Sequence, residues 1–287
     1  ELNAERDRLY KKHPKTTFIL AHQSVVMLDA IADQEKVEVG AEEFEQALAL
    51  LARAQGIPTP ALRQRLQIVT KCGIKLLSPA RPSHAVKHYD TSHAHITASV
   101  ENSLRALRTD RIDVLLIHRP DALMDADEVA QTFGQLRAAG KVLHFGVSNH
   151  TPSQFALLHR RLPLVTNQIE FSPLNLGALA DGTLDQAQDL GTPPMVWSPL
   201  AGGRLLKAQD EQPQRVRSVL EALGREHGVS AVTMAYAWIR RHPSRPLPIT
   251  GSGRVEALRE AVAALNVQLT AEDWYRVWQA SMNREVA

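Results

Sequence analysis

The sequence lacks cysteine pairs, long apolar runs and an excess of either charge, and each absence excludes a class of protein. Its one cysteine, Cys72, excludes a disulfide framework and any zinc or iron–sulfur site that needs several cysteines. No apolar run approaches the roughly 18 residues of a membrane-spanning helix, and residues 1–8 are too charged for a secretory signal. The net charge of +2, from 33 Lys and Arg against 31 Asp and Glu, gives no reason to expect a nucleic-acid or membrane partner. We therefore expect a cytoplasmic protein.

The chain does contain a regular alternation of short apolar runs and amphipathic stretches. The apolar runs predict strands at residues 16–22, 37–39, 66–71, 113–118, 144–148, 165–171, 195–198 and 247–250. The stretches between them carry apolar residues at helical spacing, and helices are expected at 42–54 and 125–139, from Pro152 and from Thr270. Strands alternating with helices predict βαβ units and a parallel sheet.

Several of the predicted strands from residue 66 onward carry polar residues at or toward their carboxyl ends: Lys71, His118, Ser148 with Asn149, Asn167 with Gln168, and Ser198. Barrels and open α/β sheets place their chemistry at this edge of the strands. A buried ammonium without a partner is costly, so Lys71 points to a functional site. The alternative is a structural salt bridge, for which the sequence offers Asp29, Asp33 or Glu170.

The segments around these residues resemble the aldo-keto reductase family. The segments are IVTKCGI, DVLLIHRPD, KVLHFGVSN, TNQIEFSPL, VWSPLAGGRL and PLPITGSGRVEALREAV, and they occur in family order from about residue 42 to the carboxyl terminus. They are most similar to a bacterial subgroup of predicted oxidoreductases. The resemblance implies a (β/α)8 TIM barrel that forms one domain over residues 1–287, with irregular amino-terminal strands and residues 1–41 atypical for the family.

The resemblance also implies a site. Lys71 matches the catalytic lysine of the family and His118 its catalytic histidine. The implied cofactor is NADP(H), with Ser148, Asn149, Asn167 and Gln168 matching the residues that bind the nicotinamide carboxamide. Ser198, Leu200 and Gly202 match the loop over the pyrophosphate, and Gly251, Ser252 and Arg254 match the segment that holds the adenosine phosphate.

The catalytic Asp and Tyr of the family have no identifiable counterpart. When the TT pair of TTFILAHQS is aligned with the family pattern, Ile19 stands in place of the Asp and Ser24 in place of the Tyr. The tyrosines of the chain are Tyr10, Tyr89, Tyr236 and Tyr275, and none falls at the family position. Since a positioned general acid typically contributes about 10²–10⁴-fold, we expect carbonyl reduction to be slow or absent while cofactor binding is retained.

Three functions follow from these residues. The first is an NADP-dependent oxidoreductase that reduces a small aldehyde or ketone by hydride transfer, without a metal. The second is a non-catalytic NADP-binding relative of the family, or a chimera. The third is a metal-dependent, amidohydrolase-like barrel that uses His22 together with His118.

Overall fold

The computed structural model describes residues 17–21, 24–28, 58, 67–77, 85–107, 109–252 and 255–286. The predicted helix at 42–54 and the predicted strand at 37–39 lie outside these residues. The chain divides into two compact units, and each is considered by itself. The first unit comprises Glu1–Phe18 and Gln23–Asn167, and the second comprises Ile19–His22 and Gln168–Ala287.

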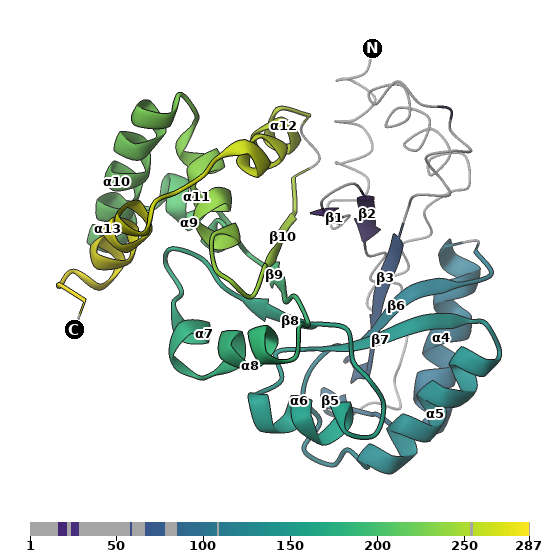
Figure 1. Ribbon diagram of the computed structural model, residues 1–287. Coiled ribbons are helices and arrows are strands. Elements are labelled where there is room, and N and C mark those ends of the chain that lie inside the picture. The colour runs from purple at the N-terminus through teal and green to yellow at the C-terminus, as the bar shows by residue number, and fades with distance from the viewer. Residues whose placement is uncertain are drawn as a thin grey trace. The chain divides into compact units, whose positions relative to one another are not determined.

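The first unit is built on a parallel sheet in the order β2–β3–β6–β7 (Figure 1). Its strands are β2 (Ser24–Leu28), β3 (Gln67–Cys72), β6 (Ile112–Ile117) and β7 (Val142–Ser148). All six residues of β6 are buried, as expected for a strand with neighbours on both sides and cover on both faces.

Three helices and one small hairpin complete the described part of the first unit. The helices are α4 (His93–Leu107), α5 (Ala126–Ala138) and α6 (Pro152–His159). Phe133 of α5 stacks on Phe145 of β7 with ring centroids 4.1 Å apart, so α5 packs directly on the sheet. The hairpin pairs β4 (Ile74–Lys75) with β5 (His88–Tyr89) in antiparallel fashion, and it follows β3 directly.

The second unit also has parallel strands: β8 (Asn167–Glu170) pairs with β9 (Met195–Trp197), and β9 pairs with β10 (Leu247–Thr250). β1 (Thr17–Ala21) lies beside β10. The helices are α7 (Gly177–Ala180), α8 (Thr183–Asp189), α9 (Arg204–Lys207), α10 (Glu211–His227), α11 (Ala231–Arg240), α12 (Val255–Ala263) and α13 (Ala271–Met282). Two short 3₁₀ helices are η1 (Ala201–Gly203) and η2 (Ala264–Asn266).

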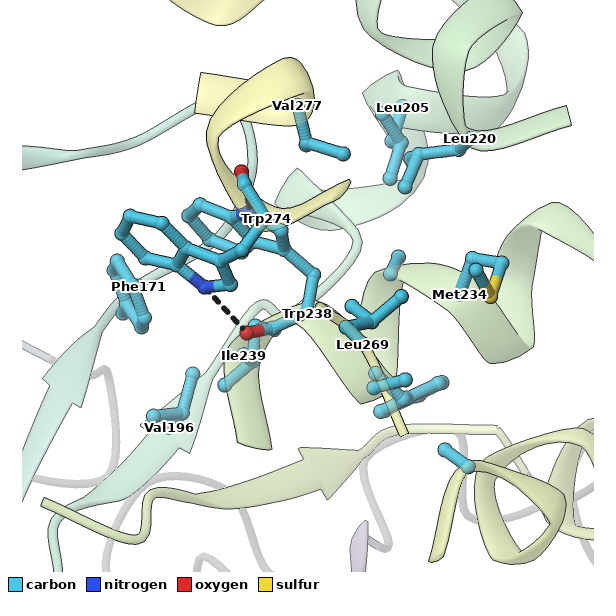
Figure 2. Close-up of a cluster of buried hydrophobic side chains, with 14 of the residues drawn as sticks. Phe171, Val196, Leu205, Leu220, Met234, Trp238, Ile239, Leu269, Trp274 and Val277 are labelled. Atoms are coloured by element: carbon cyan, nitrogen blue, oxygen red, sulfur yellow. Dashed lines mark hydrogen bonds between the residues drawn. The ribbon is translucent and has the colours of Figure 1, made fainter. Parts of the chain in front are cut away.

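The core of the second unit is centred on two tryptophans (Figure 2). Trp238 of α11 and Trp274 of α13 stack with centroids 5.0 Å apart. Each indole Nε1–H donates to the main-chain oxygen of the other residue, at 2.9 Å from Trp238 and 3.0 Å from Trp274. Phe171, just after β8, packs against Trp238 with centroids 5.2 Å apart. This cluster therefore joins two helices to the sheet.

The predicted helix boundaries follow from their capping residues. Asp125 caps α5 by accepting from the backbone N–H groups of residues 127 and 128. Thr151 and Thr270 each form a reciprocal capping box at the start of α6 and α13. None of the described helices is long and apolar enough to cross a membrane.

Two strand predictions differ from the structure. The strand beside β3 is β2 at Ser24–Leu28, a segment that we did not predict as a strand because its apolar run is short. The predicted strand at 165–171 is shorter, so Asn167 and Gln168 open β8 and do not close it. Neighbouring barrel strands are staggered, and Asn167 at the start of β8 is hydrogen-bonded to the backbone just beyond the end of β7.

Candidate functional site

The two predicted catalytic residues lie at adjacent strand ends in the first unit. Lys71 of β3 stands opposite Leu116 of β6 in the sheet register. The backbone N–H of His118, directly after β6, donates to the carbonyl of Cys72 at 2.9 Å. Both side chains are half-buried. The sheet therefore places a lysine near the carboxyl end of β3 and a histidine directly after the neighbouring strand β6.

The loops that follow these two strands are tied to each other. The hydroxyl of Thr91, after β5, donates to the carboxylate of Asp121 in the loop after β6 at 2.8 Å. Within the β4–β5 hairpin, the Lys75 ammonium lies 2.6 Å from the Asp90 carboxylate. Burial opposes ionisation of Asp90, yet its pKa is lowered because Lys75 and Ser92 hydrogen-bond to the carboxylate. Charge-assisted contacts therefore hold the loops that follow β3 and β6, the strands that carry or precede Lys71 and His118.

The end of β7 carries a polar turn. Ser148 is 2% exposed, and its hydroxyl accepts a hydrogen bond from the side-chain amide of Asn149 at 2.8 Å. Asn149 has a left-handed backbone with φ of 57°, which is uncommon for a residue other than glycine. Such strain persists only where the surrounding structure holds it, and it is concentrated at ligand sites.

Asn167 holds the backbone beyond this turn. Its Oδ1 accepts from the His150 N–H at 3.3 Å, and its Nδ2 donates to the His150 carbonyl at 2.8 Å. The resemblance implied that Asn167 binds the nicotinamide. In the structure, its carboxamide is hydrogen-bonded to protein backbone through both of its polar atoms.

His150 is a residue of this turn that the sequence analysis missed. It is 3% exposed, and its Nδ1 lies 3.0 Å from the carbonyl oxygen of Ser148. Because a carbonyl only accepts, Nδ1 carries the proton. Burial lowers the pKa of His150 to about 4 against the hydrogen bond to Ser148, so the ring is neutral near pH 7. The one available signal was its place directly after the SN pair at a strand end.

The predicted phosphate-binding residues belong to the second unit. Ser198, Ala201, Gly202 and Gly203 all have left-handed conformations, with φ from 51° to 89°. A Cβ built on Gly202 or Gly203 meets no atom within 4 Å, so the backbone there is open. The N–H groups of Ala201 and Gly203 donate to the carbonyls of Ser198 and Leu200 at 2.8 and 3.0 Å, and Gly202 between them is exposed. Left-handed turns of this kind can form concavities that bind anions, so the exposed backbone at Gly202 is suited to a pyrophosphate.

The other predicted cofactor residues of this unit are placed as follows. Gln168 is buried, and its Nε2 lies 3.9 Å from Met195 Sδ. Leu200 is half-buried and precedes η1, and Gly251 is exposed just after β10. The Ser252 N–H donates to the hydroxyl of Thr250 at 3.4 Å. Arg254 lies outside the described residues.

Comparison with known proteins identifies the family. The chain matches the Aldo/keto reductase family over residues 40–281. It belongs to this family. It is 50% identical over 230 residues to oxidoreductase YdhF of Escherichia coli, covering 79% of this chain and 76% of that protein. It is 42% identical over 230 residues to a 6-dehydroglucose reductase of Agrobacterium fabrum, again over 79% of this chain and 76% of that protein.

A solved structure shows the fold. The chain is similar to a thermostable aldo-keto reductase, Tm1743, in complex with the inhibitor epalrestat, with a TM-score of 0.64 and 24% identity. The similarity covers 83% of this chain and 78% of that one. The predicted (β/α)8 barrel is therefore confirmed, and the chain is an oxidoreductase of the aldo/keto reductase family.

The amino-terminal part of this aldo/keto reductase family member contains the positions aligned with the family Asp and Tyr. The positions aligned with the family Asp and Tyr fall on different strands, because Ile19 belongs to β1 and Ser24 begins β2. The carboxylate that directly follows β2 in the sequence is Asp29, one of the partners considered for Lys71, and it lies outside the described residues. Asp33 lies outside them as well.

The described tyrosines occupy three different settings. Tyr89 is exposed on β5 and stands opposite Ile74, three residues beyond Lys71. Tyr236 is buried in α11, and burial raises its pKa despite a hydrogen bond with Thr250. Tyr275 is exposed on α13. Tyr10 lies outside the described residues. Among the described tyrosines, Tyr89 is therefore the one that lies in the hairpin directly after β3, the strand that carries Lys71.

The metal-dependent alternative depended on His22 and His118. His22 lies outside the described residues. Within the part of the chain that the structure describes, no three His, Cys, Asp or Glu side chains are grouped so that they could hold a metal ion.

Proposed function

We propose that this member of the aldo/keto reductase family reduces a small aldehyde or ketone to the alcohol with NADPH. The single observation that carries the proposal is the arrangement at the carboxyl ends of β3, β6 and β7. Lys71 and His118 stand at neighbouring strand ends, and the polar turn at Ser148 and Asn149 closes the next strand. Carboxyl ends of barrel strands are where this fold places its chemistry.

The donor groups of the turns fit the cofactor. Ser148 and Asn149 offer a hydroxyl and an amide, which are suited to the carboxamide of a nicotinamide. The open left-handed turn at Gly202 and Gly203 is suited to the pyrophosphate. Gly251, Ser252 and Arg254 follow β10 in the sequence, and an arginine there is suited to a 2′-phosphate. When bound, the cofactor supplies the hydride.

Lys71 and His118 act on the carbonyl oxygen of the substrate. The ammonium of Lys71 stabilises the negative charge that develops on this oxygen as the carbonyl is reduced. The imidazole of His118 orients the oxygen by a hydrogen bond, and an imidazole can deliver a proton near neutral pH. The balance is one carbonyl, one NADPH and one proton on one side, and the alcohol and NADP⁺ on the other.

The first substrates to test come from the relatives. The Agrobacterium fabrum protein is named a 6-dehydroglucose reductase, which is an enzyme that acts on an oxidised sugar. We infer that sugar aldehydes belong in the substrate panel together with simple aliphatic and aromatic aldehydes.

The experiment measures NADPH oxidation with this panel for the wild type, Lys71→Met and His118→Phe. Lys141→Met and His144→Phe are matched controls, since both residues lie on the amino-terminal side of β7. We expect slow turnover that the two site variants abolish and the two controls retain. Equal rates in all five proteins would overturn the roles of Lys71 and His118.

A second function is a relative that binds NADPH without turning over a carbonyl. It is favoured by the tyrosines, because none of Tyr10, Tyr89, Tyr236 and Tyr275 falls at the family position. The same assay decides between the two functions. Cofactor binding without oxidation by any aldehyde of the panel supports the second.

A further inference from the structure

We propose that His150 and Asn167 are a pair of positioning residues that hold the Ser148–Asn149 turn in the shape that receives the nicotinamide carboxamide. The inference rests on the proposed function, because it assigns these residues to the cofactor site. It goes beyond that function because it assigns Asn167 and His150 to holding the backbone of the turn, through contacts with the protein and not with the cofactor.

The first observation is that the strained residue is held from both sides. Asn149 has φ of 57°. On its amino-terminal side, the carbonyl of Ser148 accepts from His150 Nδ1 at 3.0 Å. On its carboxyl-terminal side, the N–H and the carbonyl of His150 both bond to the side chain of Asn167. Three hydrogen bonds therefore bracket one left-handed residue.

The second observation concerns the other ring nitrogen of His150. Nε2 is buried, and no donor among the described residues lies within hydrogen-bond distance of it. A buried acceptor without a partner costs stability, so an apolar ring would pack better at this position. The histidine is thus explained by its Nδ1–H donor and not by packing.

The third observation is the chemistry of Asn167. Its Oδ1 and Nδ2 are both directed to the backbone of His150. Because the Asn167 side chain bonds to both the N–H and the carbonyl of His150, it fixes the backbone directly after Asn149. Asn167 therefore acts through His150, at the point where β8 begins.

Two substitutions separate positioning from packing. His150→Phe keeps the ring and loses the Nδ1–H donor, whereas His150→Asn keeps an amide N–H near the place of Nδ1 and loses ring packing. We expect His150→Phe to retain or raise the melting temperature while it weakens NADPH binding by roughly 10- to 100-fold. We expect His150→Asn to lower the melting temperature while NADPH binding stays near the wild-type value.

Hydrogen exchange of the cofactor-free protein tests the same pair without any ligand. In His150→Phe, the backbone amides of residues 149 and 150 should exchange at least about tenfold faster than in the wild type. His242→Phe is the control, because His242 Nδ1 lies 2.9 Å from the Ser244 hydroxyl in a turn before β10. This control should leave both the exchange of residues 149–150 and NADPH binding unchanged.

The outcomes distinguish a failure of the positioning role of His150 from a failure of the proposed function. Wild-type exchange at residues 149 and 150 in His150→Phe would overturn the inference, whether or not the protein binds NADPH. A wild type that binds no NADPH, with the exchange result as expected, would overturn the proposed function and leave the bracing of the turn established. Wild-type NADPH binding in His150→Phe together with a loss of binding in His150→Asn would assign His150 to packing and overturn the inference.

Discussion

Gly146 shows at the level of one residue how closely the strands of the first unit approach their neighbours. A Cβ on this residue of β7 would lie 2.7 Å from the Leu116 side chain and 2.7 Å from the Thr166 carbonyl. The Thr166 carbonyl is itself held, because it accepts from the Val147 N–H at 3.1 Å. The backbone beside Gly146 therefore has little freedom to move away.

We predict that Gly146→Ala lowers the free energy of unfolding by about 1–3 kcal/mol, since overpacking forces the neighbours apart. Gly134→Ala is the matched control, because a Cβ there meets nothing within 4 Å in the middle of α5. This control should raise the free energy of unfolding by roughly 0.5–1 kcal/mol through helix propensity. Urea denaturation of the two variants measures both values, and the same sign in both would contradict the packing argument.

The burial of His150 predicts how the stability of the protein depends on pH. Burial holds its pKa at about 4, below the ordinary value of 6.5. As pH falls below about 6.5, the unfolded chain binds a proton that the folded chain does not, so stability declines until about pH 4. His150→Phe should therefore lose less stability than the wild type between about pH 7 and about pH 5, by on the order of 1–2 kcal/mol. Urea midpoints at the two pH values measure this, and an identical decline in both proteins would refute it.

At the level of elements, α11 and α13 are joined by the reciprocal hydrogen bonds of Trp238 and Trp274. Figure 2 shows the one from the Trp274 indole to the Trp238 carbonyl. The Trp238 carbonyl belongs to the last turn of α11, where it accepts from the Arg241 N–H at 3.3 Å. The Trp274 indole is a second donor to this carbonyl, at 3.0 Å. The two helices are thus fastened by both packing and hydrogen bonding.

Trp274→Phe is predicted to destabilise the protein by roughly 2–4 kcal/mol, because it removes buried ring area and one of the two hydrogen bonds to the Trp238 carbonyl. Trp278→Phe is the control on the same helix, where the indole is half-buried and lies against Met282. We expect a loss of less than about 1 kcal/mol for the control. Thermal or urea unfolding measures the stability of both variants. Equal losses of stability would show that the reciprocal hydrogen bonds of Trp238 and Trp274 add no more stability than the contacts of Trp278.

Several elements were predictable from local chemistry. The caps at Asp125, Thr151 and Thr270 place the starts of α5, α6 and α13, because a side-chain oxygen there satisfies a free backbone N–H. The β4–β5 hairpin was not predictable, because each of its strands has two residues and no alternation of apolar and polar side chains. The ties between Thr91 and Asp121 and between Asn167 and His150 join residues distant in sequence, so no local pattern indicates them.

The candidate site was predictable only in part, because some of its contacts also join residues that are distant in the sequence. Lys71 and His118 are conspicuous in the sequence because polar residues end apolar strands. His150 is not conspicuous, since its role depends on a φ angle at Asn149 and on a partner 17 residues away. Asn167 was assigned to the cofactor from its place in a motif, and only the geometry shows which atoms its amide meets.

At the level of the whole molecule, the division into two compact units raises the question of cooperativity. We propose that residues 1–287 behave as one domain, because a (β/α)8 barrel is typically a single packed domain of about 250 residues. Near-ultraviolet circular dichroism reports the tryptophans of the second unit, and far-ultraviolet circular dichroism reports both units. The two probes should give one coincident urea transition. Two separated transitions would show that the units unfold independently.

The most direct test of the account is calorimetric titration of the wild-type protein with NADPH and, separately, with NADH. We assign the Ser148–Asn149 turn to the nicotinamide and the Ser252 and Arg254 segment to the 2′-phosphate. We therefore predict saturable binding of one NADPH per chain, with NADH bound more weakly because it lacks that phosphate. Equal affinity for both cofactors would contradict the assignment of the phosphate segment. Absence of binding by either one would contradict the central claim that this chain is a nicotinamide-dependent reductase.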